Sequence, residues 1–308
     1  MEQRLKRILD KSTFNNLMRL DNRLAFLHLA VRIFVEIGLV VGLALSSSNY
    51  TLIAILILAI GFWHSFWGYA GYAHELFHGR VFSSKRLNRA LFVFSTAITF
   101  NNRAFFMKSH SRHHNQTFHE SDEETFSIQQ WGRLHVILYC LVDFRLIFRK
   151  LAYTFTNAAG FVPDEYKMIK SSIIRSAFEI LTINTLLYVL IWFLSGEIFI
   201  AFYFFVAQFS CQLPAKMLAQ AQHLGLKSRA KEGPFGHSRT IILPRILSFL
   251  YSNMNYHCEH HLLPAVSYYN LPAVNKLLKD SEIPFNECDI SYFFGDFWHD
   301  LEANENRI

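Results

Sequence analysis

Cysteine is scarce in this sequence: the 308 residues include four, at positions 140, 211, 258 and 288, and no two of them form a CxxC pair. This scarcity argues against a disulfide framework, a cysteine-based zinc site and an iron–sulfur cluster. Glycine and proline are also few, at 13 and 7 residues, which excludes a collagen-like chain. Charged residues make up only 18% and apolar residues 52%. The composition therefore excludes a disordered chain and is typical of a membrane protein.

The net charge is modestly basic, because 30 Lys and Arg stand against 24 Asp and Glu. Since these cations accompany long apolar runs, we expect contacts with anionic lipid headgroups or an acidic redox partner, and none with nucleic acid. The mean hydropathy of +0.17 is low for a chain made only of membrane helices. A substantial polar part is therefore predicted outside the lipid. The basic N-terminal stretch lacks the apolar core of a cleavable signal peptide, and we expect none there.

Four apolar runs predict four transmembrane helices, arranged as two hairpins. The runs cover residues 24–45, 50–73, 177–194 and 198–213. Lys and Arg precede the first hairpin and its turn carries no charge, so the positive-inside rule places the N-terminus in the cytoplasm. Residues 74–170 and 216–308 should then form a cytosolic cap. We expect one domain over 1–308, in a bacterial cytoplasmic membrane rather than the endoplasmic reticulum.

Two smaller features also call for an interpretation. Residues 87–107 are apolar but interrupted by Asn101, Asn102 and Arg103, which predicts an interfacial or re-entrant helix. In the first predicted span, His28, Arg32 and Glu36 lie four residues apart and share one helix face. Charges in lipid need partners, so we expect an intrahelical ion pair that faces the helix bundle.

Histidine is unusually abundant, with 15 residues, and it recurs at spacings that face one side of a helix. The strings HELFH (74–78), HSRHH (110–114) and HCEHH (257–261) place histidines three or four residues apart. A single histidine, at position 223, lies between the second and third strings. Adjacent histidines diverge by about 100°, which lets one helix supply two metals. The predicted metal ligands are His74, His78, His110, His113, His114, His223, His257, His260 and His261.

This donor set indicates the kind of metal. Eight or nine neutral imidazoles are too many for one tetrahedral ion and suit a pair of divalent transition metals, whereas magnesium and calcium prefer oxygen. Two irons that activate dioxygen are the natural choice. The predicted fold is thus an all-α membrane protein whose helical cytosolic cap holds a histidine-ligated di-iron site. Nearby carboxylates that would orient the imidazoles are Glu75, Asp122, Glu123 and Glu259.

Other interpretations remain open beside this one. The remaining histidines, at positions 28, 64, 119, 135, 237 and 299, are expected to be ordinary surface or hydrogen-bonded residues. The string at 74–78 is also a literal HExxH, the signature of zinc proteases. A protease of that class needs one further ligand, and this chain offers two additional three-histidine clusters. A metal carrier is a further alternative, although transport sites usually lie near mid-membrane within inverted repeats.

The histidine strings and their flanks resemble the integral-membrane fatty acid desaturase family, the histidine-box superfamily that also contains hydroxylases. The resemblance covers about residues 24–273 and is most specific in HELFHG, HSRHHNQT and NYHCEHHLLPAVSYYNLP. It implies four membrane helices beneath a cytosolic cap that holds two irons through the nine histidines named above. It also implies a reaction that removes hydrogen from an unactivated C–H bond with dioxygen and two electrons. Ala219 stands where some acyl-CoA members have asparagine, which leaves the subfamily open.

The residues themselves support the same reaction class. Hydrogen abstraction from a methylene needs a metal with accessible redox chemistry, which zinc lacks. The chain has no GxGxxG string for a flavin or nicotinamide and no cysteine cluster, so a separate electron donor of ferredoxin or cytochrome type, with its reductase, is implied. We therefore expect an O2-dependent desaturase that introduces a C=C bond into a fatty acyl or lipid substrate. Hydroxylation or another oxygenation of a lipid-like substrate is the alternative.

Overall fold

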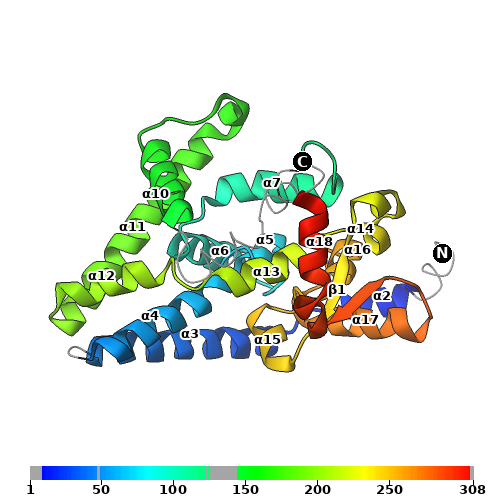
Figure 1. Ribbon diagram of the computed structural model, residues 1–308, viewed down its shortest axis with the longest axis horizontal. Coiled ribbons are helices and arrows are strands. Elements are labelled where there is room, and N and C mark those ends of the chain that lie inside the picture. The colour runs from blue at the N-terminus through cyan, green and yellow to red at the C-terminus, as the bar shows by residue number, and fades with distance from the viewer. Residues whose placement is uncertain (1–8, 47–48, 123, 125–143, 306–308) are drawn as a thin grey trace.

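The computed structural model describes residues 9–46, 49–122, 124 and 144–305, and these residues are mostly helical (Figure 1). The helices of the first half are α2 (Lys11–Leu17), α3 (Asn22–Leu45), α4 (Tyr50–Ser65), α5 (Tyr72–His78), α6 (Lys85–Ile98), α7 (Arg103–Asn115) and α10 (Phe144–Ala158). Those of the second half are α11 (Lys170–Ser195), α12 (Ile198–Ala207), α13 (Leu213–Ala221), α14 (Pro234–His237), α15 (Arg245–Leu250), α16 (His257–Leu262), α17 (Leu271–Asp280) and α18 (Asp296–Glu305).

One end of the molecule is built from long apolar helices. Figure 1 shows α3, α4 and α12 reaching this end together, and Leu43, Ile53, Ile60 and Phe204 pack between them. Their outer faces expose large apolar side chains, such as Phe34, which is 79% exposed. An apolar surface of this kind needs a nonaqueous neighbour.

Two helical stretches of the described residues are long and apolar enough to cross a membrane. They are Lys11–Leu45, which contains α3, and Asp164–Ser195, which contains α11. The helices α4 and α12 are apolar but shorter, ending at Ser65 and Ala207. Within the predicted spans 50–73 and 198–213 these helices end earlier than the apolar runs do, and the four-span arrangement stays a prediction.

A tight turn ends α4 and redirects the chain into α5. The amide of Tyr72 donates to the carbonyl of Phe66 at 2.9 Å, so six residues fold back on themselves. A Cβ atom at Gly71 would collide with that same carbonyl, which explains the glycine. The apolar sequence continues through this turn, and for that reason the hydropathy pattern alone predicted an unbroken helix.

The apolar segment 87–107 forms parts of two helices instead of one. The chain leaves α6 after Ile98, and Asn102 then caps α7 by accepting a hydrogen bond from the amide of Ala104 at 3.1 Å. Arg103 pairs with Glu179 of α11 at 2.7 Å, which joins α7 to the longest helix. The new helix direction carries the second histidine string toward the first.

The polar stripe on α3 faces inward, as expected, but its members do not pair with one another. Arg32 is buried and donates to the carbonyls of Phe249 and Leu250 at 2.9 and 2.8 Å. Glu36 instead bonds to His64 of α4 at 2.6 Å. The predicted intrahelical ion pair is wrong, because partners on neighbouring elements lie closer than the next turn of the same helix.

A small parallel sheet departs from the predicted all-α fold. Strand β1 (Arg239–Ile242) pairs with β2 (Asn286–Asp289), with Arg239 opposite Asn286. On its other side, Ile241 exchanges hydrogen bonds with Asn255, just before α16. The sheet thus anchors the start of the helix that carries the third histidine string.

Candidate metal centre

Four segments bring the predicted ligands together: the helices α5, α7 and α16, and the turn that follows α13. All nine histidines fall into two groups, and within each group the candidate ligand atoms lie within 4.8 Å of one another. The first group is His74, His78, His110, His114 and His260, and the second is His113, His223, His257 and His261. Each of α7 and α16 supplies histidines to both groups, as the divergence of adjacent side chains on a helix requires.

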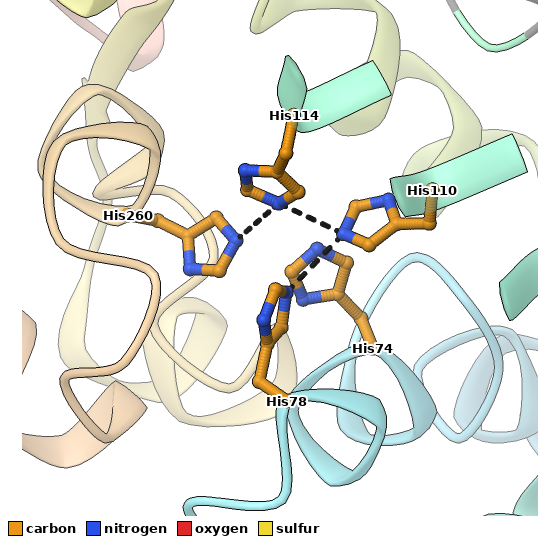
Figure 2. A group of neighbouring side chains, drawn as sticks. All are labelled: His74, His78, His110, His114 and His260. Atoms are coloured by element: carbon orange, nitrogen blue, oxygen red, sulfur yellow. Dashed lines mark hydrogen bonds between the residues drawn. The ribbon is translucent and has the colours of Figure 1, made fainter. Parts of the chain in front are cut away.

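In the first group, rings from three helices point their nitrogens toward a common centre (Figure 2). The Nε2 atom of His110 lies 3.2 Å from that of His78 and 3.0 Å from that of His114. The Nε2 atom of His260 lies 3.1 Å from that of His114. His74 completes the group, and its Nε2 atom is buried with no hydrogen-bond partner in the described part of the chain.

The second group repeats this geometry with four buried rings. The Nε2 atom of His257 lies 2.8 Å from that of His223 and 3.1 Å from that of His261. His113 joins through His261, with 3.2 Å between their Nε2 atoms. The isolated histidine at 223 therefore lies beside two members of the third string.

The spacing of the nitrogens and the orphaned Nε2 atom of His74 fit a pair of bound metal ions. Imidazole nitrogens at about 2.0–2.1 Å from one ion, at tetrahedral to right angles, lie about 2.9–3.4 Å apart. Neutral imidazoles cannot all donate to one another, so an inward-facing cluster of lone pairs needs a cation at its centre. The donor atoms are nitrogen throughout, which suits a divalent transition metal.

Hydrogen bonds at Nδ1 hold several rings with Nε2 inward. His110 donates to Glu124 at 2.9 Å and His113 to Asp122 at 3.1 Å. His74 donates to the adjacent Glu75 at 2.9 Å. The fourth is His223, which donates to the backbone carbonyl of His237 at 2.7 Å. Such partners fix the tautomer and leave the Nε2 lone pair free for a metal.

The four predicted carboxylates differ in whether they contact an imidazole. Glu75 and Asp122 contact imidazoles, as expected. Glu259 does not bond to a ring of the described residues and accepts instead from Thr240 and from Asn275. Glu123 lies outside the described residues. Its neighbour Glu124 contacts His110 but is not among the predicted carboxylates, although it belongs to the same short run of acidic residues.

Burial holds the imidazoles in the neutral form that binds metals. Removal from water lowers the pKa values of eight of these histidines below their usual range, and neighbouring imidazoles lower them further; the eight are His74, His78, His110, His114, His223, His257, His260 and His261. Burial also raises the pKa of the Glu124 carboxyl, to about 7.

The remaining histidines are mostly remote from the two groups. His64 bonds to Glu36, His28 lies 2.8 Å from the Tyr268 hydroxyl, and His119 and His299 are exposed. His135 lies outside the described residues. His237 differs from the prediction because it is buried, with its ring 5.1 Å from that of His261. Because His237 lies outside the three histidine strings, the sequence gives no indication of its contact with His261.

A cavity of about 480 Å³ borders both groups. It reaches His74 and His110 of the first group and His113, His223 and His257 of the second. Aromatic side chains form much of its wall, namely Tyr69, Phe100, Phe105, Phe106, Tyr153 and Tyr251. An elongated apolar molecule in this cavity would lie next to both candidate metal positions.

A protein-family model described as "Fatty acid desaturase" matches residues 47–289, which is most of the chain and includes all nine histidines. No curated protein matches the sequence.

Proposed function

Because the chain belongs to the fatty acid desaturase family, we propose that it uses dioxygen to introduce a C=C bond into a fatty acyl chain. The family supports an oxidoreductase of lipid metabolism in general. The finer assignment rests on one observation: two groups of imidazoles border a single aromatic-walled cavity. Hydroxylation or another oxygenation of a lipid-like substrate is the alternative, because it begins with the same C–H cleavage.

Two irons are the metals we propose for the site. His74, His78, His110, His114 and His260 would hold one, and His113, His223, His257 and His261 the other. Bound iron would supply what no side chain can, namely dioxygen activation and the oxidising power to cleave an unactivated C–H bond. Glu75, Asp122 and Glu124 would keep the imidazoles in the metal-binding tautomer.

The chain's own residues would position the substrate and exclude water. Phe106 stacks on His110, with 4.8 Å between ring centroids, and Tyr69 stacks on Phe106 at 3.7 Å. This aromatic wall leads directly to a candidate ligand. An acyl chain along it would present a methylene beside the imidazole groups in an environment from which bulk water is displaced.

We also propose the membrane arrangement and the partners. The apolar helices α3, α4, α11 and α12 would form four membrane spans. The nine histidines and both segments of the cap, residues 74–170 and 216–308, would lie in the cytoplasm. The asymmetry of Lys and Arg before the first hairpin supports this orientation. Electrons would come from a separate ferredoxin or cytochrome and its reductase, because the sequence carries no nucleotide-binding glycine string and no cysteine cluster.

Expression in a host of known lipid composition tests the proposed reaction. Mass spectrometry of total fatty acids should show new products that are lighter than their saturated precursors by two hydrogen atoms. Products heavier by one oxygen atom would establish a hydroxylase instead. A His260→Ala variant expressed to the same level is the matched control and should leave the host lipids unchanged.

The zinc-protease alternative finds no support in the site geometry. A catalytic zinc takes three protein ligands and keeps a position for water. Here His74 and His78 of the HExxH string converge with three further histidines. The glutamate of that string, Glu75, bonds to His74 of its own helix.

A further inference from the structure

A second cavity, of about 620 Å³, lies among α5, α6, α7 and the start of α11. It shares no lining residue with the cavity that borders the histidine groups. Its volume is within the range of about 300–1,000 Å³ that is typical of ligand sites. Nothing in the proposed reaction uses this space, so its chemistry is a separate question.

The rim of this second cavity is positively charged. Lys85 and Arg89 lie one helical turn apart on α6, both are exposed, and neither side chain has a hydrogen bond or ion pair within the described ranges. Lys108 also lines this space from α7, but its ammonium donates to the carbonyl of Glu165 at 2.8 Å and lies over the Tyr166 ring, so Lys85 and Arg89 are the cations left for a ligand. The fourth cation, Arg103, is already neutralised by Glu179 at 2.7 Å, and among the described residues no carboxylate lines this cavity. An anion placed at the rim would therefore meet unbalanced positive charge.

The floor of the second cavity is apolar. Leu76, Phe92 and Ala104 are buried there, and Phe77, Val93, Met107 and Ile169 extend the apolar lining. A free phosphate would leave this floor without a partner. The combination of a cationic rim and an apolar floor suits an amphiphile with an anionic head and a hydrocarbon chain.

The position of the second cavity relative to a possible membrane span indicates which amphiphile it would bind. Ile169 and Ser172 form one edge of the cavity, and they lie in Asp164–Ser195, a stretch long enough to cross a membrane. The cavity therefore lies near the end of that stretch, where lipid headgroups would surround it. We propose that it binds one molecule of an anionic phospholipid, with the phosphate at Lys85 and Arg89 and an acyl chain on the apolar floor.

Such a lipid would contact the first histidine group indirectly, through Phe77, which lines the second cavity. The ring of Phe77 lies 5.0 Å from that of His78 and 5.3 Å from that of His110. An acyl chain packed on Phe77 would restrict α5 and thereby steady two rings of the first group. The lipid is distinct from the substrate, because the two cavities have separate linings.

Native mass spectrometry of the delipidated full chain in detergent tests the site. Titration with phosphatidylglycerol should show one saturable lipid and a higher thermal unfolding temperature, whereas phosphatidylcholine should bind much more weakly. In a Lys85→Glu/Arg89→Glu variant the apparent Kd should rise by at least about tenfold, because two favourable charges become repulsive.

Two further variants make the test decisive. Arg245→Glu/Lys276→Glu carries the same charge change at exposed positions outside both cavities and should bind phosphatidylglycerol as the parent does. Val93→Trp should block the lipid without altering charge, because it fills the floor. Equal binding by the two charge-reversed variants would overturn the proposal. So would equal binding of phosphatidylcholine, or full competition by inorganic phosphate.

Discussion

For a single imidazole in this centre, the decisive property is which nitrogen faces inward. The Nδ1 atoms of His74, His110 and His113 are bonded to carboxylates, and their Nε2 atoms face the other imidazoles. A carboxylate on the outer nitrogen also increases the basicity of the inner one. Small changes behind the rings should therefore alter metal binding without removing any ligand.

Glu124 allows a direct test of this effect. In Glu124→Ala, His110 loses the acceptor that lies 2.9 Å from its Nδ1 atom. We expect metal affinity or turnover to fall about 10–100-fold, the usual cost of removing such a partner. Iron content and turnover of the purified protein measure both. Glu120→Ala is the matched control, since Glu120 is exposed and should tolerate the change. Parent-like iron retention and turnover in Glu124→Ala would remove this residue from the centre.

His223 is the ligand candidate whose role is easiest to isolate. Its Nε2 atom lies 2.8 Å from that of His257, in the second group only. His223→Ala should therefore lose metal selectively and retain about one tightly bound iron per chain, while turnover is abolished. His299→Ala, at an exposed position, should keep both irons. A His223→Ala protein with two irons and full activity would show that His223 is no ligand.

Among the elements, α16 depends most on its neighbours, because it has only six residues. Glu259, buried within it, accepts from Thr240 of β1 and from Asn275 of α17. This carboxylate thus joins a strand and a helix to the segment that carries the third histidine string. Its role is to position α16 rather than to orient an imidazole.

Replacing Thr240 by valine tests the link between β1 and α16. The valine keeps the shape but removes the hydroxyl, so one oxygen of the buried Glu259 carboxylate loses its donor. The free energy of unfolding should fall by about 1–3 kcal/mol, visible as a lower Tm. Thr240→Ser should restore most of it. Thr156→Val, at an exposed position on α10, is the control. Equal Tm values for Thr240→Val and the parent would refute the link.

Element boundaries and contacts differ in how far the sequence predicted them. The histidine spacing predicted which residues of each string share a helix face, because side chains three or four apart do so whatever surrounds them. His223 stands outside the strings, so spacing alone did not predict its place in the second group. Hydropathy could not predict that α4 ends at Ser65, since residues 66–71 are mostly apolar although they form a turn. Proximity in sequence also misled for Glu259, whose partners Thr240 and Asn275 reach it only through the fold.

At the scale of the whole molecule, the composition of the bound metal distinguishes the proposed enzyme from its rival. Nine clustered imidazoles in two groups should bind about two irons per chain and little zinc. Elemental analysis of the purified protein measures this ratio. Removal of the metal with a chelator should abolish turnover, and ferrous iron should restore it. One zinc and no iron per chain would favour the protease.

The proposed orientation in the membrane is also open to experiment. Glu197 is exposed in the turn between α11 and α12, whereas Glu120 is exposed after α7. A cysteine at Glu197 should react with an impermeant thiol reagent added to intact cells, and one at Glu120 should react only after lysis. The parent protein, with its native cysteines, gives the background. Labelling in the reverse pattern would invert the arrangement.

Each of the two histidine groups combines residues from early and late parts of the chain. His74 and His78 are synthesised long before His260, and His113 long before His257 and His261. A ribosome that has not yet reached codon 257 has therefore made only partial sets of imidazoles, four in the first group and two in the second. In the proposed di-iron enzyme, metal loading would consequently be a late event in biogenesis, and a prematurely terminated chain would remain without either complete set of imidazoles.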